Sequence, residues 1–264
     1  MKFAALASGS SGNCIFISTG LTSVLVDAGI SCRRIEDSLK ELGLVPGDID
    51  GILLTHEHSD HIQGLGTLTK KYKIPIYGTI ETLAALKRTP VGKGIPVELM
   101  MNIEGDAEFA IGDIGVNVAE VMHDAAHPVC YRFTDGEHVI AMATDLGDYD
   151  DKIVKHLSGA GLVYIESNYD PDMLMVGPYP YYLKQRIDGE RGHLSNERSA
   201  ELMVSVLHPG LKKIVLAHLS KENNYPEIAW QTHANAIREA NTGYTPELSV
   251  AKRSELSEVY IFGD

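Results

Sequence analysis

The chain has 264 residues, of which 44% are hydrophobic and 22% charged, and its formal net charge at pH 7 is −13. This length allows one large domain or two smaller ones, and the composition is ordinary for a soluble globular protein. The acidic balance argues against a protein that grips nucleic acid through net charge alone, because such proteins are usually basic.

The three cysteines, Cys14, Cys32 and Cys130, follow no spacing typical of a disulfide framework or a CxxC site. We therefore expect a reducing, cytoplasmic location. The apolar start of the chain is interrupted from Ser8 to Asn13, which predicts no export signal. No apolar stretch reaches membrane-spanning length, so no membrane association is expected.

Apolar runs bounded by Gly, Pro or Asp predict buried strands, and apolar residues at helical spacing predict helices between many of them. The strands are expected, in chain order, at residues 2–7, 14–18, 23–29, 51–56, 74–78, 116–121, 138–145, 162–167, 213–218 and 258–263. The helices are expected at residues 32–43, 81–88, 150–157, 195–208 and 226–240. Two paired strands followed by strand–helix units predict a mixed α/β protein with layered sheets.

Five of the apolar runs end in an acid or a histidine. These residues are Asp27, His56, Asp145, Glu166 and His218. Any one of them could be a turn residue, since Asp favours turns. Together they predict one face at which strand ends converge on a site, because ligands often bind beyond the carboxyl ends of strands in α/β proteins.

The segment "HEHSDH" has the pattern H-x-H-x-D-H at His56, His58, Asp60 and His61. Residues two apart in an extended segment point to the same side, so His56 and His58 could share one ion. Asp60 and His61 come where the chain turns into a helix, which Ser59 or Asp60 could cap, and would point toward a second ion. Imidazole and carboxylate together suit zinc, manganese or iron.

The alternative interpretation is a solvated surface turn on which histidines fall together by chance. The preceding run "GILL" argues against it, because that run anchors the motif on a buried strand. The sequence therefore favours a metal site.

The segment "THEHSDHIQG" resembles the signature of the metallo-β-lactamase fold superfamily, and "ASGSSGN", "HDAAHPVCY" and "LAHLSKENN" resemble its YycJ/WalJ-like branch. The resemblance implies a single domain over residues 1–264, folded as a four-layer αββα sandwich. It also implies a hydrolase with two divalent ions, zinc or manganese with iron possible. Members of this branch resemble 5′→3′ exonucleases.

The resemblance assigns His56, His58 and His123 to one ion, and Asp60, His61 and His218 to the other, with Asp145 bridging. Two ions ~4 Å apart hold a hydroxide that acts as the nucleophile. We also take Asp60 as a catalytic residue. Asp27 is expected to orient a ligand histidine from behind it, with a plain turn role as the alternative. His127 competes with His123, which follows its strand directly and matches the family position.

His193 lies just before the helix expected to begin at Ser195 or Asn196, and ribonuclease Z-like members carry a similar histidine with an acid at a preceding strand end. Here that acid would be Glu166. The pair could hold a protonated imidazole near the leaving oxygen, as a general acid or a phosphate contact. The alternative is that His193 only satisfies backbone groups at the helix start.

Between Glu166 and His193 lies a basic, tyrosine-rich segment, from which we take Tyr181, Tyr182, Lys184 and Arg186 as substrate-binding candidates. Aromatic rings stack single-stranded bases and cations hold phosphates. A loop that the tyrosines pack over the sheet is the alternative.

The expected function is a phosphodiesterase, most simply a nuclease acting on single strands or 5′ ends. A small-molecule ester hydrolase such as a lactonase is the alternative, because the same ligands would serve either chemistry. DNA against RNA, the polarity of cleavage and the oligomeric state stay open.

Overall fold

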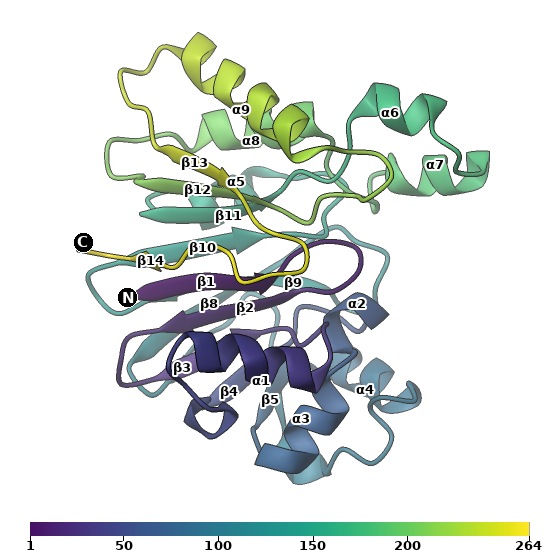
Figure 1. The fold of residues 1–264 in the computed structure, drawn as a ribbon, viewed down its shortest axis with the longest axis vertical. Helices are drawn as coiled ribbons and strands as arrows, with labels where there is room; N and C mark the ends of the chain where they lie inside the picture. Colours follow the sequence, from purple (N-terminus) through teal and green to yellow (C-terminus); the bar gives the residue numbers. More distant parts are fainter. Residues whose placement is uncertain (264) are drawn as a thin grey trace. The chain divides into compact units, whose positions relative to one another are not determined.

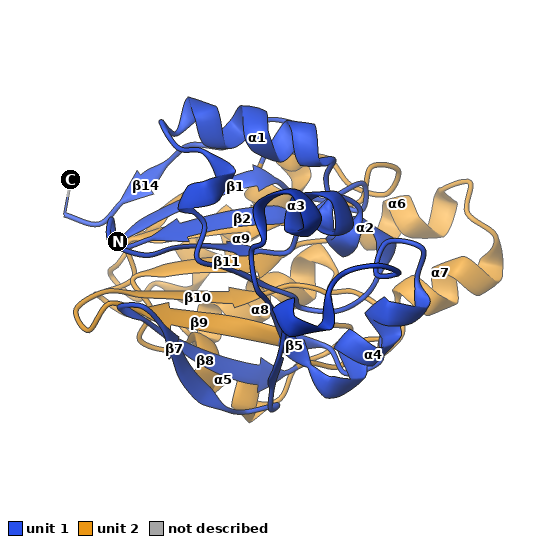
Figure 2. Ribbon diagram, turned by 90° about the horizontal axis from the view of Figure 1, so that it is seen from below, with its two compact units in different colours: residues 1–120, 125–129, 252–264 blue, residues 121–124, 130–251 orange. Residues whose placement is uncertain are grey.

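The computed structural model describes residues 1–263, and the chain divides into two compact units (Figure 2). Unit 1 comprises residues 1–120, 125–129 and 252–264, and unit 2 comprises residues 121–124 and 130–251. Each unit is built around β-strands with helices beside them. The expectation of a single domain stays a prediction.

Unit 1 contains a sheet with the strand order β14-β1-β2-β3-β4-β5-β6. Strands β14, β1, β2 and β3 pair antiparallel, and β3 to β6 pair parallel. The bounds are β1 (Lys2–Ala7), β2 (Cys14–Ser18), β3 (Ser23–Val26), β4 (Gly51–Leu53), β5 (Ile76–Thr79), β6 (Met100–Ile103) and β14 (Tyr260–Ile261). The unit also contains an antiparallel hairpin of β7 (Glu108–Ile111) and β8 (Ile114–Glu120).

The helices of unit 1 are α1 (Cys32–Glu41), α2 (Ser59–Ile62), α3 (Leu65–Tyr72) and α4 (Ile80–Arg88), with 3₁₀ turns at Pro46–Asp48 and Val97–Leu99. Their apolar faces join the sheet in one core. Ile35 and Leu39 of α1, for example, cluster with Leu25 of β3 and Ile52 of β4, all of them fully buried. In Figure 1, α1 accordingly lies against these strands.

Unit 2 contains strands in the order β13-β12-β11-β10-β9. Strands β10 to β13 are parallel, and β9 pairs antiparallel with β10. The strand bounds are β9 (Val129–Thr134), β10 (Val139–Ala143), β11 (Leu162–Glu166), β12 (Lys213–Ala217) and β13 (Glu247–Val250). The helix bounds are α5 (Asp151–Leu157), α6 (Pro171–Val176), α7 (Tyr181–Ile187), α8 (Asn196–Ser205) and α9 (Pro226–Ala240).

The parallel strands of unit 2 place three predicted site residues at one end of the sheet. Within β10 and β11, Ala143 pairs with Ile165, and within β11 and β12, Glu166 pairs with Ala217. The carboxyl ends of these neighbouring strands are therefore level. In Figure 1, α6 and α7 stand beyond these ends, whereas α8 and α9 cover β11, β12 and β13.

Most of the expected strands and helices form, and α8 begins after Ser195, whose side chain accepts a hydrogen bond from the Arg198 amide as expected of a cap. Three local expectations were wrong. The last strand covers only Tyr260–Ile261, and α2 follows His58 with no side-chain cap from Ser59 or Asp60. The segment after Glu166, where no helix was expected, forms α6 and α7, because Asp170 caps a helix that Pro171 starts.

Within residues 1–263, no helix is both long enough and apolar enough to cross a membrane.

Candidate metal centre

The histidines of the H-x-H-x-D-H motif gather at the carboxyl end of β4 in unit 1. Leu54, Thr55 and His56 continue the buried run beyond the strand, and His56 is 1% exposed. The ring centroid of His56 lies 4.6 Å from that of His58 and 4.1 Å from that of His61. A solvated turn would not bury these rings, so the surface-turn interpretation was wrong for His56 and His61.

Asp27 orients the ring of His61 through a hydrogen bond at Nδ1. Its carboxylate accepts hydrogen bonds from His61 Nδ1 (2.8 Å), from the Thr55 amide (2.9 Å) and from Thr55 Oγ1 (2.9 Å). Complete burial raises the pKa of Asp27, although the adjacent His61 opposes that rise. Because His61 Nδ1 is used in the hydrogen bond to the Asp27 carboxylate, His61 can offer only Nε2 as a metal ligand.

Asn13 is a further site residue that the sequence patterns did not predict. Its side-chain nitrogen lies 3.1 Å from His61 Nε2 and donates to Asp60 Oδ2 at 3.3 Å. Its backbone amide donates to the Asp60 carbonyl at 2.8 Å. The β1–β2 loop is thus attached to both Asp60 and His61. Only the turn-rich run "SGSSGN" that ends at Asn13 could have pointed to it.

The attachment of this loop depends on a glycine that follows Asp27. A Cβ built on Gly29 would lie 1.7 Å from the Asp60 carbonyl oxygen, which is backbone and cannot swing away. We expect Gly29→Ala to lower the free energy of unfolding by about 2 kcal/mol or more, because it forces Asp60 and its neighbours apart. Urea denaturation measures the change.

The matched control for this substitution is Gly47→Ala, since a Cβ on Gly47 would meet nothing within 4 Å. The control should unfold within a few tenths of a kcal/mol of the original chain, in line with ordinary surface substitutions. Equal stability of the two variants would show that Gly29 is not needed for close packing on Asp60.

His127, the competitor of His123, is occupied by two carboxylates of unit 1. Its Nδ1 lies 3.0 Å from Glu81 Oε2 and its Nε2 lies 2.8 Å from Glu120 Oε1. Burial lowers the pKa of His127, but the two carboxylates outweigh it and raise the pKa overall. Both ring nitrogens of His127 already face carboxylates, so neither is left for a metal ion, which favours His123.

Unit 2 presents its site residues at strand ends with unusual backbone conformations. Asp145 after β10 has φ 58° and His218 after β12 has φ 54°, and in unit 1 Asp27 after β3 has φ 60°. Residues other than glycine seldom adopt this left-handed conformation, and such strain gathers at functional sites. The conformation turns each side chain away from the direction that a continuing strand would give it.

Glu166 is hydrogen-bonded to two histidines of unit 2. Its Oε1 accepts hydrogen bonds from His193 Nδ1 (2.7 Å) and His218 Nδ1 (3.0 Å), and its Oε2 accepts from the Leu146 amide (3.1 Å). Complete burial raises the pKa of Glu166, but the two imidazoles outweigh burial and hold the pKa below its usual value. The structure thus brings Glu166 and His193 together, and it adds a contact with His218 that was not foreseen.

His123 is supported by the loop that also carries His193. Its Nδ1 donates to the Gly192 carbonyl at 2.9 Å, and Arg191 donates to the His123 carbonyl at 3.1 Å. His123 Nε2 lies 4.0 Å from Asp145 Oδ1. Burial lowers the pKa of His123, so the ring is held neutral, as a metal ligand must be.

The donor set of unit 2 fits a divalent ion. Asp145, Glu166, His193 and His218 offer ligand atoms that all lie within 4.8 Å of one another. Asn168 steadies His218 by donating to its carbonyl at 2.7 Å. Imidazoles whose Nδ1 atoms are held by carboxylate or carbonyl groups, next to buried carboxylates, are the arrangement found around bound zinc and related metals.

The predicted substrate residues lie on α7, which has no buried residue. Tyr181 and Tyr182 are 71% and 72% exposed, so they do not pack over the sheet, whereas Tyr169 is buried and donates to Asp188. Arg186 pairs with Asp124 at 2.5 Å, and Lys184 donates to the Met175 carbonyl at 2.6 Å. The four candidates thus form an accessible surface rather than a closed pocket.

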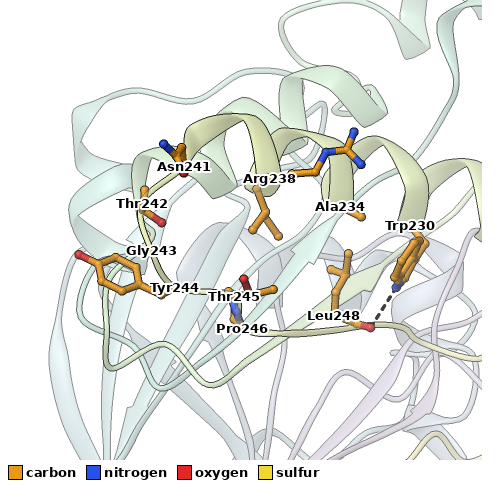
Figure 3. A pocket seen from close by; sticks show the side chains of 11 residues that line it. Trp230, Ala234, Arg238, Asn241, Thr242, Gly243, Tyr244, Thr245, Pro246 and Leu248 are labelled. Atoms are coloured by element: carbon orange, nitrogen blue, oxygen red, sulfur yellow. Dashed lines mark hydrogen bonds between the residues drawn. The ribbon is translucent and has the colours of Figure 1, made fainter.

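A cavity of about 530 Å³ in unit 2 holds none of the predicted site residues (Figure 3). It lies between α9 and the segment leading into β13, with Trp230 at one end, where its indole nitrogen donates to the Leu248 carbonyl at 3.1 Å. Tyr244 lies at the other end of the view. The edge of β13 is therefore covered by the indole ring.

Residues 22–219 match the family model of the beta-lactamase superfamily domain. The chain is 39% identical over 249 residues to exodeoxyribonuclease WalJ of Streptococcus pneumoniae, covering 94% of this chain and 93% of that protein. It is 38% identical over 251 residues to exodeoxyribonuclease YycJ of Bacillus anthracis, covering 92% and 91%.

Solved structures share the fold over nearly the whole chain. The metallo-beta-lactamase fold protein YhfI of Bacillus subtilis has a TM-score of 0.68 at 22% identity, covering 97% of this chain and 99% of its own. Zinc-bound PqqB of Methylobacterium extorquens has a TM-score of 0.71 at 17% identity, covering 98% and 100%. These matches confirm the expected α/β fold class, and the chain belongs to the β-lactamase superfamily, with WalJ and YycJ among its relatives.

Proposed function

We propose that the protein is a metal-dependent phosphodiesterase that removes nucleotides from the end of a DNA strand. Two curated relatives, 38–39% identical over more than nine tenths of both chains, are exodeoxyribonucleases, and this similarity carries the proposal. The clustered imidazoles and carboxylates of the site agree with a metal-dependent hydrolase.

The ligand assignment keeps the order of the motifs. His56, His58 and His123 are assigned to one divalent ion, and Asp60, His61 and His218 to a second, with Asp145 shared. Zinc and manganese suit these donors, and iron is also compatible. When bound, such ions polarise the scissile phosphate and lower the pKa of a water, which supplies the nucleophile at neutral pH.

The residues around the ligands orient them and handle a proton. Asp27 fixes the Nδ1 proton of His61, and the Gly192 carbonyl fixes that of His123. The Glu166 carboxylate accepts a hydrogen bond from His193 Nδ1–H, which leaves His193 Nε2 as the ring nitrogen that can carry a proton to the leaving oxygen. Since His193 is part-buried, that proton is available at the surface of the site.

The α7 surface is our candidate for binding unpaired bases of the substrate. Tyr181 and Tyr182 offer exposed rings for stacking unpaired bases, and Arg186 offers a cation beside them. Phosphate would have to compete with Asp124 for Arg186 and with the Met175 carbonyl for Lys184. We expect this surface to tune affinity, with the chemistry performed elsewhere.

The lactonase alternative has no comparable support from the curated relatives. A cytoplasmic location stays part of the proposal and is compatible with three buried cysteines that are not joined in disulfides.

The proposal is tested by loading the full chain with zinc or manganese and giving it oligodeoxynucleotides and two small-molecule substrates. The oligodeoxynucleotides are 5′-phosphorylated or 5′-hydroxyl, each as single and double strands. The small molecules are an aryl phosphodiester and a lactone. We expect progressive shortening of an oligodeoxynucleotide with release of mononucleotides. Hydrolysis of the lactone with the oligodeoxynucleotides left intact would assign the site to ester hydrolysis instead.

A further inference from the structure

A second cavity lies beside Asp60 in unit 1, and its volume is about 480 Å³. One wall is the β1–β2 loop at Ser10 and Ser11, and a second is α2 with Gln63 directly after it. The other wall is the segment from Thr89 to Val91, directly after α4. The volume falls within the range of small-molecule sites.

The chemistry of the lining favours a neutral, partly apolar group. Ser10, Ser11, Gln63 and Thr89 supply hydroxyl and amide groups, and Ile62 and Val91 supply apolar surface. Among the described residues that line the cavity there is no Lys or Arg, while Glu57 and Asp60 are acidic. A phosphate would meet carboxylates here with no cation to balance it, whereas a sugar and base would find hydrogen bonds and an apolar wall.

The walls of the cavity are attached to the proposed ligand segment. Asn13 ties the serine loop to Asp60, and within that loop the Gly12 amide donates to the Gly9 carbonyl at 2.9 Å. On the other wall, Thr89 Oγ1 donates to the Leu86 carbonyl at 2.8 Å and accepts from the Gly92 amide at 3.0 Å. The cavity is therefore formed before any ligand arrives, at a fixed place relative to Asp60.

The same wall continues into the most basic stretch of an acidic chain. Residues 70–93 contain six Lys and Arg side chains and a single acid, Glu81, although the whole chain has a net charge of −13. Lys70, Arg88 and Lys93 are exposed. Lys70 Nζ donates to the Lys93 carbonyl at 3.4 Å, and the Lys93 amide donates to the Thr89 carbonyl at 3.2 Å. Exposed cations therefore lie next to the uncharged lining segment from Thr89 to Val91.

The geometry points to a terminal-nucleotide site. We infer that the cavity receives the end nucleoside of a single-stranded nucleic acid, and that Lys70, Arg88 and Lys93 hold the phosphates that follow it. This inference rests on the proposed function and deepens it, because an enzyme that recognises one end nucleoside would act on strand ends. The basic stretch also supplies the local positive charge that an acidic nuclease needs.

The cavity is tested by filling it from Gln63, an exposed residue of its lining. Gln63→Trp is compared with Thr67→Trp, an equally exposed position on α3 outside the cavity lining. Each metal-loaded variant is assayed on thymidine 3′-(p-nitrophenyl phosphate), which carries a nucleoside on the side of a 5′ strand end, and on bis(p-nitrophenyl) phosphate, which carries none. We expect Gln63→Trp to lose at least ~10 times more kcat/KM on the nucleoside substrate than on the other. Thr67→Trp should lose equally on both.

Ser11→Trp, on the exposed loop wall, is the second filling variant and should give the same selective loss. Loss on both substrates together, or on neither, by both tryptophan variants would overturn the nucleoside site. The proposed function would survive that result as long as the unmodified chain still shortens oligodeoxynucleotides. If the unmodified chain cleaves bis(p-nitrophenyl) phosphate but never an oligodeoxynucleotide, the proposed function itself fails.

The basic rim is tested by binding in place of turnover. A fluorescein-labelled phosphorothioate oligothymidylate is titrated with the metal-free full chain at several salt concentrations. We expect Lys70→Glu combined with Lys93→Glu to weaken binding. The slope of the logarithm of the binding constant against the logarithm of the salt concentration should fall by roughly one for each phosphate contact that is lost. Arg33→Glu combined with Lys40→Glu, on exposed positions of α1, is the charge-matched control. Equal effects of the two pairs would show that only net charge matters and would overturn the rim.

Discussion

Asp145→Ala is expected to lose both metal ions together with all activity. The expectation follows from the proposed sharing of Asp145 between the ions and from its position, buried at the end of β10 and 3.5 Å from His218 Nδ1. The loss of a shared carboxylate removes a ligand and a negative charge from each ion. Elemental analysis after loading with zinc or manganese should fall from about two equivalents toward none.

The backbone of Asp145 requires a second variant. Its φ of 58° is tolerated by Asn and disfavoured for Ala, so Asp145→Asn keeps the backbone while removing the charge. Asp151→Asn, an exposed acid at the start of α5, is the control that changes the same group away from the site. An Asp145→Asn or Asp145→Ala protein that still binds two equivalents would show the shared role to be wrong.

Much of this fold could be read from local pattern. Continuous apolar runs such as residues 214–217 and 162–165 are typical of buried strands between helices, and both are buried along their whole length in β12 and β11. Some of the strands that were missed have weak patterns, whereas β9 is mostly buried and its run VCYRFT could have been read as a strand. Strand β6 is half exposed and β13 lies at the edge of its sheet, so neither carries the apolar run that marks a central strand.

The two helices after Glu166 were missed for a different physical reason. Helix α7 has no buried residue and α6 buries only Leu174, so neither shows the apolar face on which helix prediction depends. Their start signals are purely local: Asp170 before Pro171, and Pro180 before Tyr181. Such signals could have been read, but in a segment dense in Pro, Gly and Tyr they are easily mistaken for a turn.

The site was predictable where one motif or one strand end carries the information. The H-x-H-x-D-H motif and the acids after apolar runs lie where the sequence places them, at the ends of β3, β4, β10, β11 and β12. Contacts between distant segments were not predictable. No periodicity links Asn13 to His61, or His218 to Glu166, and only the folded chain brings these pairs within 3.1 Å and 3.0 Å.

The sharpest test of the proposed chemistry is His193→Ala, assayed on substrates with different leaving groups. His193 Nδ1 donates to Glu166 Oε1 at 2.7 Å, which orients the ring. If that ring protonates the leaving oxygen, its removal should slow oligodeoxynucleotide cleavage ~10²–10⁴-fold while the metal content stays unchanged. His218 keeps its own hydrogen bond to Glu166 in this variant, so the ligand beside His193 remains held.

The slowing by His193→Ala should shrink sharply on bis(p-nitrophenyl) phosphate, because nitrophenolate leaves without needing a proton. His58→Ala, which removes a proposed ligand, should instead lose metal and activity on every substrate. His208→Ala is the outlying control, since the His208 ring is hydrogen-bonded to the Ala160 carbonyl and the Gly210 amide, neither of which is a proposed site residue. Equal slowing of His193→Ala on both substrates would indicate a phosphate contact that acts before the transition state. Unchanged rates on both would leave His193 as a residue that only supports the start of α8.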